Sequence, residues 1–588
     1  WDVKPTLTTC TQCPVGCSTF ADSRFDVLLR TRFDHVSADP HQDPAGDWLC
    51  DRGRYNVGFL TDRRRLAQPM VRSGEDQWVD LAWSDAIELV AKTLKDAVAA
   101  FGPQSIGAIG GGRLTNEEAY LLQHLVRGLG SANLDYRTHG ELTANPGRLA
   151  AEIRDLDNAD VILEVGADSV EQAPVLDLRV RYAVQHHAAQ LAYVGDAKPS
   201  WPLYFRHFAA GGDAAAVLNE AAANVRHEED APKSAGEAPA VALARLLRSG
   251  ERIVLIWDGK HAAVAAAVER LIDALRERDK HAGVLVVGHA PNARGAEAMG
   301  MHPAFAPGYA PAAQRGLTTE GMLRAAARGE LKALLVFGAN PLLSYPDGAL
   351  VRAALERLPF LVSADLFMTG TALRSHVALP VRSGYEKAGH TTALDGTVKR
   401  VQVASQPQNG EPLSDREILF LLADAAGVAI PDESELEQAA ATLPGAAAQR
   451  SLAPSAAAFA VDAAVGGGEG EFVVCALPRL YAGGGTSAHD DALAALRPRA
   501  TAFVNRGDAE RLGLDDGDVV ELRNAHGALG GLEVETGERV PAGYVGVIAE
   551  LPEAPANAIS GGVGGVRAGL RLVSKGERAT ALAGAKGA

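Results

Sequence analysis

Short apolar runs alternate with amphipathic stretches along the middle of this 588-residue chain. Stretches with apolar residues at helical spacing lie between the apolar runs. Alternating strands and helices predict parallel sheets that are covered on both faces, which is an α/β fold. The strand-like runs, each ending in a loop, are ADVILEVGAD (159–168), AQLAYVGDA (189–197), ERIVLIWDG (251–259), AGVLVVGHA (282–290), KALLVFGANPL (332–342) and PFLVSADLF (359–367).

Two stretches before these runs carry further signals. Residues 80–102 have apolar residues at helical spacing, and Ser84 and Asp85 can cap the N-terminus of that helix. Residues 105–130 predict a strand, a glycine-rich loop and a helix. The loop, 110–112, lies where a doubly wound sheet often binds a nucleotide phosphate, but tight strand-to-helix turns also use glycine without any ligand. No GxGxxG fingerprint follows the first strand, so the sequence does not predict NAD binding.

Composition divides the chain into five parts. Residues 1–65 are predicted to form a small domain of short strands and turns, and residues 66–430 the α/β body. Residues 431–470 become rich in Ala, Gly, Ser and Pro, which predicts a linker. Residues 471–555 alternate like short strands joined by Asp-Gly and Gly turns, which predicts a β-barrel. The Gly- and Ala-rich tail, 556–588, is expected to be flexible.

The overall composition excludes some functional classes. Hydrophobic residues make up 47% and charged residues 22% of the chain, as in ordinary globular proteins. A net charge of −16 argues against a nucleic-acid partner, because phosphate binding needs clustered Lys and Arg. No apolar run approaches the roughly 20 residues that a membrane span needs, so no membrane insertion is expected. The first residue is Trp1, and we expect the chain to be part of something longer.

Four of the five cysteines lie in the first 50 residues, although the chain is poor in cysteine. Three are spaced Cys-x2-Cys-x3-Cys, and the fourth follows after 32 residues. Three thiolates close together and one distant thiolate suit the corners of a 4Fe–4S cluster. The predicted metal ligands are Cys10, Cys13, Cys17 and Cys50.

Other interpretations of the cysteines carry less weight. Disulfide frameworks belong to short secreted chains that are dense in cysteine. Structural zinc sites commonly use two Cys-x2-Cys knuckles, and Cys50 has no partner knuckle. His35 and His41 lie in the intervening loop and are alternative ligands, although a solvated loop histidine is the commoner case. Cys475 lies in an apolar strand-like run and is expected to be a bystander.

The motif CTQCPVGC…WLCDRGRY resembles the N-terminal iron–sulfur segment of the molybdopterin oxidoreductase superfamily. That superfamily includes formate dehydrogenases, nitrate reductases and one non-catalytic branch, the large peripheral-arm subunits of NADH–quinone oxidoreductase (respiratory complex I). The lead-in WDVKPTLTTC is most similar to that branch. VFGANPL, EKAGHTTALDGTVKRVQ and the C-terminal barrel extend the resemblance over nearly the whole chain. The resemblance implies a multidomain α/β body with parallel sheets, an N-terminal 4Fe–4S domain and a C-terminal β-barrel.

Catalytic members of the superfamily hold molybdenum or tungsten between two pterins, often with a protein ligand such as Cys, Ser or Asp. No cysteine lies between Cys50 and Cys475, and the segment NLDYRTHGELT contains His139 but no cysteine. A Ser or Asp ligand stays an open alternative. In EKAGHTTALDGTVKRVQ, the places of a family Asn and Arg correspond to Ala393 and Thr397, which removes donors that suit a pyrophosphate. We therefore expect no molybdopterin, no catalytic residues and no cofactor-binding residues in this portion.

The branch implies a role beside the electron path from NADH to quinone, with one 4Fe–4S cluster and a scaffold body. The implied partners are the flavin- and NADH-binding subunit and the iron–sulfur subunits of the peripheral arm. The implied location is the cytoplasmic side of the bacterial inner membrane, reached through the complex. The rival interpretation is a molybdenum or tungsten oxidoreductase such as a formate dehydrogenase, in which Arg52 would lie between cluster and pterin. A zinc-stabilised interaction module is a third interpretation.

If the pterin cofactor is absent, its space must be filled by side chains or water, because open polar clefts leave backbone groups unpaired. The segments that line this space are predicted from the strand ends and the late family motif: Gly110–Arg113, Gly166–Asp168, Gly338–Asn340 and Glu386–Gly396.

Overall fold

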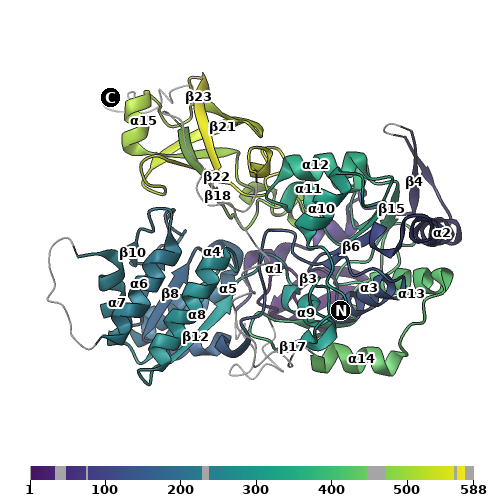
Figure 1. Cartoon of the computed structure of the whole chain (residues 1–588), viewed down its shortest axis with the longest axis horizontal. Coiled ribbons are helices and arrows are strands. Elements are labelled where there is room, and N and C mark those ends of the chain that lie inside the picture. Colours follow the sequence, from purple (N-terminus) through teal and green to yellow (C-terminus); the bar gives the residue numbers. More distant parts are fainter. Residues whose placement is uncertain are drawn as a thin grey trace.

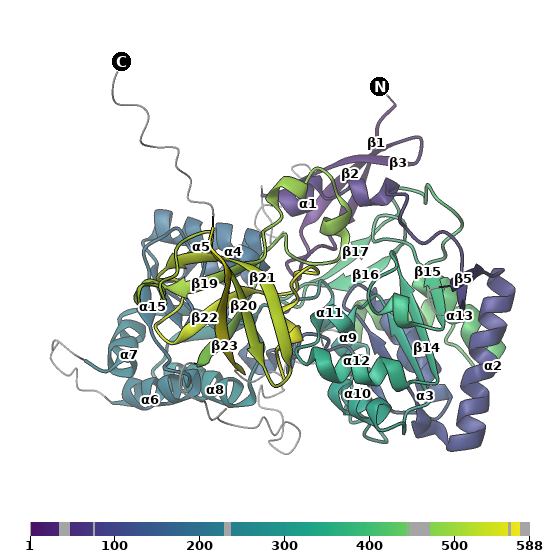
Figure 2. The same ribbon diagram turned by 90° about the horizontal axis from the view of Figure 1, so that it is seen from above.

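The computed structural model describes residues 2–33, 48–74, 77–227, 237–443, 445, 471–561 and 566–576. Two α/β units lie side by side and a β-barrel lies above them (Figure 1). Seen from above, the barrel covers the unit that carries α6, α7 and α8 (Figure 2). The predicted combination of parallel sheets and a C-terminal barrel is confirmed.

The first α/β unit is built on a seven-stranded sheet. The sheet has the order β5 (Gln77–Asp80), β4 (Met70–Gly74), β15 (Val377–Pro380), β14 (Phe360–Asp365), β13 (Ala333–Phe337), β6 (Ile106–Gly110) and β7 (Leu134–Asp135). The five strands from β15 to β7 run parallel, whereas the β4–β5 hairpin pairs with β15 in the antiparallel sense at one edge. The sheet is therefore assembled from two segments that are far apart in the sequence.

The second α/β unit, formed between those two segments, has a parallel five-stranded sheet. The order is β10 (Arg206–Phe208), β9 (Gln190–Val194), β8 (Val161–Val165), β11 (Arg252–Trp257) and β12 (His281–Val286). All six apolar runs singled out in the sequence are strands of the two sheets. The very short β7, β10 and β15 were not predicted, because strands of two to four residues carry no periodic signal.

Helices pack against both faces of each sheet, which buries the central strands on both sides and explains their continuous apolar character. One face of the seven-stranded sheet packs on α2 (Trp83–Phe101), α3 (Asn116–Gly128), α9 (Ala293–Ala298), α13 (Asp415–Ala426) and α14 (Glu433–Thr442). The opposite face packs on α10 (Thr319–Ala327) and α12 (Gly348–Arg357). The five-stranded sheet packs on α6 (Ala214–Arg226), α7 (Pro239–Ser249) and α8 (Ala262–Arg276), and on its other face on α5 (Pro174–His187).

The start of α2 differs from the prediction. The helix begins at Trp83, its N-cap is Ala82, and no side chain caps it. Ser84 and Asp85 therefore lie inside the first turn rather than before it. The helix α3, in contrast, begins with a capping box in which Thr115 and Glu118 each accept a hydrogen bond from the other's backbone N–H.

The C-terminal barrel is closed by a strand that the sequence did not indicate. Its order is β18 (Glu471–Leu477), β22 (Tyr544–Ile548), β19 (Thr501–Asn505), β21 (Gly527–Gly537), β20 (Val519–Asn524) and β23 (Val566–Ser574), and α15 (Arg506–Leu512) follows β19. β23 pairs with both β18 and β20. The expectation of a flexible tail from residue 556 is therefore wrong as far as Ser574. The strand β23 lies in that segment and closes the barrel by hydrogen bonding to β18 and to β20. Residues 562–565 and 577–588 lie outside the described part.

The start of the expected linker is also ordered. Helix α14 lies within 431–470 and contacts α3, with Leu436 fully buried between the helices. Most of the remaining linker, 446–470, lies outside the described residues. Among the helices that the structure describes, none combines the length and the apolar character needed to cross a membrane.

The N-terminal segment forms a small antiparallel sheet of β1 (Lys4–Thr9), β2 (Ser18–Arg24) and β3 (Val27–Phe33). The hairpin β16 (Gly389–Thr392) and β17 (Val398–Val401) lies beside β1. Thr9 Oγ1 donates to the Arg400 carbonyl over 2.7 Å, and the Gln402 N–H donates to Thr8 Oγ1 over 2.8 Å. The short helices α1 (Asp51–Tyr55), α4 (Ser169–Gln172) and α11 (Pro341–Ser344) complete the elements near the strand ends.

Two glycines of the 110–112 loop are required by close packing. A Cβ on Gly111 would lie 2.0 Å from the Gly338 carbonyl oxygen, and a Cβ on Gly112 would lie 2.4 Å from the Ala290 Cβ. The Gly111 N–H also donates to the Phe337 carbonyl over 2.7 Å. The loops after β6, β13 and β12 are therefore in direct contact, and steric need alone accounts for glycine here.

We predict that Gly111→Ala destabilises the seven-stranded unit, because the added methyl group meets backbone that cannot rotate away. Overpacking of this kind costs about 1–3 kcal/mol, which corresponds to a fall of about 3–10 °C in the first thermal unfolding transition. Gly537→Ala is the matched control, since no atom lies within 4 Å of its added Cβ. Equal transition temperatures for both variants would contradict the steric argument.

Candidate functional site

The loop between β1 and β2 brings three cysteines together. The Cys10 N–H donates to the Cys17 carbonyl over 2.8 Å, which closes the loop at its base. Gly16 has a φ of +63°, so a residue with a side chain would be strained at this turn. Cys50 is the N-cap of α1, and its Sγ accepts a hydrogen bond from the Gly53 N–H over 3.3 Å.

The four thiols form one buried, electrostatically coupled group. Cys10, Cys13 and Cys17 are buried and Cys50 is half-buried. Burial raises the pKa of each thiol, for Cys13 to about 12, and the charge of Cys50 raises the pKa of the other three further. Cys10, Cys13 and Cys17 also belong to one buried cluster of side chains, and Cys50 packs against it. The structure thus brings all four predicted ligands to one place.

Cationic and N–H groups compensate this group. The charge of Arg52 lowers the pKa of Cys10, Cys13 and Cys50, and Lys399 lowers that of Cys17. Backbone N–H groups at Gln12, Val15 and Gly53 donate to Cys10, Cys13 and Cys50 respectively. Four thiols with such donors fit the ligand set of an anionic iron–sulfur cluster. Within the described ranges, no three His, Cys, Asp or Glu side chains converge closely enough to hold a single metal ion.

The β16–β17 hairpin covers the cysteine loop. The Leu394 N–H donates to the Pro14 carbonyl over 2.8 Å, and Arg294 Nη1 donates to the Leu394 carbonyl over 2.7 Å. A Cβ on Gly16 would touch Ala393 at 3.4 Å. The late family segment therefore packs against the cysteine loop in this chain. His35 and His41, the alternative ligands, lie outside the described residues.

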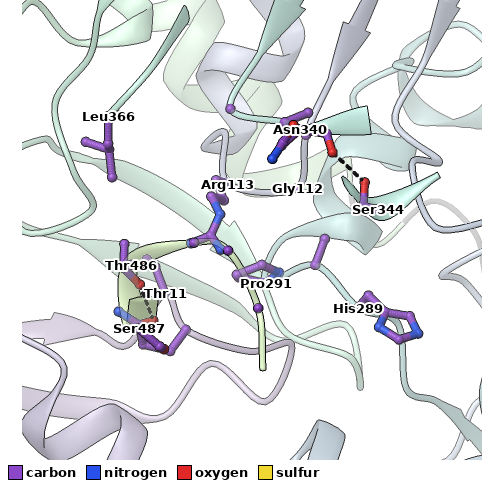
Figure 3. A pocket seen from close by; sticks show the side chains of 18 of the residues that line it. Thr11, Gly112, Arg113, His289, Pro291, Asn340, Ser344, Leu366, Thr486 and Ser487 are labelled. Carbon is purple, nitrogen blue, oxygen red and sulfur yellow. Dashed lines mark hydrogen bonds between the residues drawn. The ribbon is translucent and has the colours of Figure 1, made fainter. Parts of the chain in front are cut away.

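A cavity of about 210 Å³ lies next to the cysteine group, where loops from both α/β units and the barrel meet (Figure 3). Its walls come from the carboxyl ends of β6, β12, β13 and β14 and from loops after β18 and β22. In open α/β sheets, ligands bind at this edge. Thr11, Gln12 and Arg52 form the wall nearest the cysteines.

The segments predicted to line this space are correct in two cases out of four. Residues 111–113 and 338–340 line the cavity. Residues 166–168 do not, because Asp168 turns away and accepts a hydrogen bond from the Ser200 N–H over 2.8 Å; Glu171 and Gln172 line the wall instead. Of residues 386–396, only Lys387 lines the cavity. Glu386 does not, because both of its carboxylate oxygens accept hydrogen bonds of 2.7 Å from the Arg65 guanidinium.

Most charges along the cavity are paired within the protein. Lys387 Nζ lies 2.6 Å from Glu118 and 2.9 Å from Asp415, and all three side chains are buried. Arg113 and Arg52 are the exceptions: neither guanidinium forms a hydrogen bond or ion pair with the described part of the chain. Burial, and next the charge of Arg52, lower the pKa of Arg113. The carboxylates of Asp365 and Glu550 act on Arg113 in the opposite sense, without forming an ion pair with it in the described part of the chain.

Two histidines stack at the edge of the cavity. The rings of His139 and His289 are 4.9 Å apart and inclined by 8°. His139 lies 3.2 Å from Glu141 and 3.4 Å from Glu550. These carboxylates outweigh the effect of burial and raise the pKa of His139, whereas burial lowers that of His289. The sequence indicated His139; the position of His289 directly after a buried strand was a signal for the second ring.

None of the residues that line the cavity is a cysteine. Cys475 is half-buried in β18 and is not a neighbour of the other four. Oxygen ligands remain in the walls, among them Asp365, Ser344 and Ser383. The cavity therefore contains potential oxygen ligands for a metal but no thiolate.

Comparison with known proteins matches the chain to several oxidoreductase subunits. It is 28% identical over 586 residues to a subunit of the NADH-quinone oxidoreductase of Streptomyces coelicolor, and the match covers 90% of this chain and 66% of that protein. It is 32% identical over 467 residues to NADH-quinone oxidoreductase subunit 3 of Thermus thermophilus, and this match covers 74% of this chain and 53% of that protein.

A relative named for another activity is NADPH-Fe(3+) oxidoreductase subunit alpha of Geobacter sulfurreducens, 26% identical over 603 residues, with 89% of this chain and 69% of that protein covered. The chain thus spans between about half and two thirds of the length of these curated relatives.

Among solved structures, acetylene hydratase from Pelobacter acetylenicus has the same fold, with a TM-score of 0.62. The match covers 97% of this chain and 100% of that chain, at 15% identity. The family model for molybdopterin oxidoreductase matches residues 65–425, which is more than half of the chain. With its two parallel α/β units, its barrel and the cavity between them, the chain belongs to the molybdopterin oxidoreductase family.

Proposed function

We propose that this chain is an iron–sulfur subunit of the peripheral arm of an NADH–quinone oxidoreductase, binding one 4Fe–4S cluster through Cys10, Cys13, Cys17 and Cys50. The observation that carries this proposal is the grouping of three buried thiols and the half-buried Cys50, with N–H donors and Arg52 around them. A four-iron cluster binds each thiolate at a different iron, so its ligands lie further apart than those of one zinc ion. Cys50 also has no partner knuckle of the kind that structural zinc sites commonly use.

The assignment to complex I rests on two relatives that are named as parts of that complex. By analogy, the chain contacts the flavin- and NADH-binding subunit and the iron–sulfur subunits of the peripheral arm. It would lie on the cytoplasmic side of the bacterial inner membrane and attach through the complex. The cluster would lie off or beside the path of electrons and stabilise a small N-terminal domain that has little core of its own.

We infer further that the body has lost the molybdenum cofactor. The cavity of about 210 Å³ is below the roughly 300–1,000 Å³ of typical small-molecule sites. Arg113 extends into it, Lys387 is neutralised by two carboxylates, and no thiolate reaches it. The segment with Ala393 packs against the cysteine loop rather than facing the cavity.

The second candidate is a molybdenum or tungsten oxidoreductase that works by itself. The cavity beside Arg52, with oxygen ligands such as Asp365, favours it. The two functions differ in metal content: iron and sulfide alone for the first, iron with molybdenum or tungsten for the second.

Anaerobic reconstitution should give about four irons per chain, because a cubane binds one thiolate at each iron. Cys50→Ala should lose the cluster or convert it to a three-iron form, measured by iron and sulfide analysis and by electron paramagnetic resonance. Cys475→Ala is the matched control and should keep the full iron content, since its thiol lies in the barrel wall. A spectrally unchanged four-iron cluster in Cys50→Ala would refute the ligand set.

The absence of the cofactor is tested on protein produced with molybdate and tungstate supplied. We expect neither metal in stoichiometric amount by mass spectrometry. The denatured, oxidised protein should also release no pterin fluorescence. Stoichiometric molybdenum or tungsten with pterin, or formate-dependent dye reduction by this chain, would favour the second candidate.

A further inference from the structure

We propose that the ion pair between Glu171 and Arg479 is a releasable latch, which holds the C-terminal barrel against the second α/β unit. When the latch opens, the barrel turns about its anchor on the seven-stranded unit, and the inner cavity becomes continuous with a groove at the surface. The barrel is then a hinged lid rather than a fixed wall. The latch acts in the same way in either candidate function, because it depends on the contacts of the barrel and not on what the cavity holds.

The latch joins α4 of the second unit to the segment directly after β18. Arg479 Nη1 donates to Glu171 Oε1 over 2.6 Å, and the Leu480 N–H donates to Glu171 Oε2 over 2.9 Å. Ser200 Oγ, in the second unit, donates to Glu171 Oε1 over 3.0 Å. Both oxygens of this carboxylate are therefore engaged, and two of the three donors come from the barrel side.

The latch lies between two hollows. The inner cavity of about 210 Å³ and an outer groove of about 590 Å³ both have Glu171, Arg479 and Leu480 in their walls. Arg499 lines the outer groove with 83% of its side chain exposed, so this groove lies at the surface. Separation of Glu171 from the two barrel-side residues therefore joins the inner cavity to the groove.

The rest of the interface between the barrel and the second unit is also polar. Arg539 Nη2 donates to Ser200 Oγ over 2.9 Å, and the Lys198 N–H donates to the Arg539 carbonyl over 2.8 Å. The ion pair of Lys198 with Glu538 is exposed and borders another groove, of about 470 Å³. Of the residues described in the second unit, only Ala197 packs against the hydrophobic core of the barrel. Polar interfaces between domains permit relative motion.

The barrel is anchored differently on the seven-stranded unit. Asn557, which is buried, donates through Nδ2 over 3.0, 3.2 and 2.9 Å to three backbone carbonyls at α11, those of Leu342, Leu343 and Tyr345. A Cβ on Gly348, at the start of α12, would lie 2.7 Å from the Asn557 carbonyl oxygen, so the two backbones touch. Figure 1 shows the barrel meeting α11 and α12 on this side. Buried polar contacts are costly to break, so the barrel turns here and parts at the latch.

Solvent reaches the latch. The side chains of Arg479 and Glu171 are 24% and 13% exposed. Ion pairs that water and salt can reach contribute little net stability, and salt weakens them. The Arg479 guanidinium also lies over the Phe503 ring, 5.4 Å from its centre, so a released guanidinium keeps a favourable contact within the barrel. The open state is therefore accessible at equilibrium and becomes more populated as salt is added.

The experiment measures access to the inner cavity through a thiol introduced in its wall by Ser344→Cys (Figure 3). Labelling of the full chain by N-ethylmaleimide is followed by peptide mass spectrometry, which separates this thiol from the native cysteines. In this background, Arg479→Gln and Glu171→Gln should each be labelled about two to five times faster, the factor that an ion pair of this exposure contributes. Glu533→Gln is the matched control, because Glu533 pairs with Arg499 at 3.4 Å in the wall of the same groove but entirely within the barrel. Its labelling rate should equal that of the parent.

Salt separates a latch from a general loss of stability. Raising NaCl from about 0.05 M to about 0.5 M should speed the labelling of the parent and leave the rate of Arg479→Gln unchanged. The double variant Glu171→Gln/Arg479→Gln should be labelled no faster than either single variant, because each already breaks the same contact. Thermal unfolding checks that every variant is folded at the labelling temperature.

Three results would overturn the latch. The first is an unchanged labelling rate in both single variants, and the second is a parent that is labelled as fast as the denatured chain. The third is an equal rise in Glu533→Gln, because any loss of charge in the groove would then loosen the barrel.

Discussion

The burial of four thiols in one place is the constraint on which the arrangement of this molecule depends. Neighbouring thiols cannot all ionise without opposite charge, N–H donors or metal to offset their repulsion. The chain meets this need with segments that are far apart in the sequence: the β1–β2 loop, α1 with Arg52, and the β16–β17 hairpin with Lys399. The same cysteine loop packs on one face of the five-stranded sheet and so links the N-terminal domain to the body.

Buried ion pairs connect segments that are far apart in the sequence. The Arg65 guanidinium pairs with both carboxylate oxygens of Glu386, and the Lys387 ammonium pairs with Glu118 and with Asp415. Each pair is almost wholly buried, and removing one partner of such a pair leaves a buried charge that costs about 3–5 kcal/mol. The pairs tie the loop before the hairpin to α3, to α13 and to the start of the body. They also neutralise Lys387, which lines the cavity.

The cavity is small because the loops that form its walls lie close together. Gly111 and Gly112 bring the ends of β6, β12 and β13 into contact, and the barrel loop presses on Arg113. Family membership establishes the architecture, but function depends on the groups at the site. Here the lining residues include Arg113, which extends into the cavity, and a stacked histidine pair, and none of them is a cysteine, which is a different chemistry from that of the four cysteines next to it.

The sequence by itself determined the α/β class, the six main strands, the barrel and the four cysteine candidates, because apolar runs and cysteine spacing are local signals. It did not reveal β23 as the closing strand or the true start of α2, since a barrel edge and a helix start are chosen by packing. It indicated His139 but not its partner His289. Only the tertiary structure decided those features, because they depend on side chains brought together from distant segments.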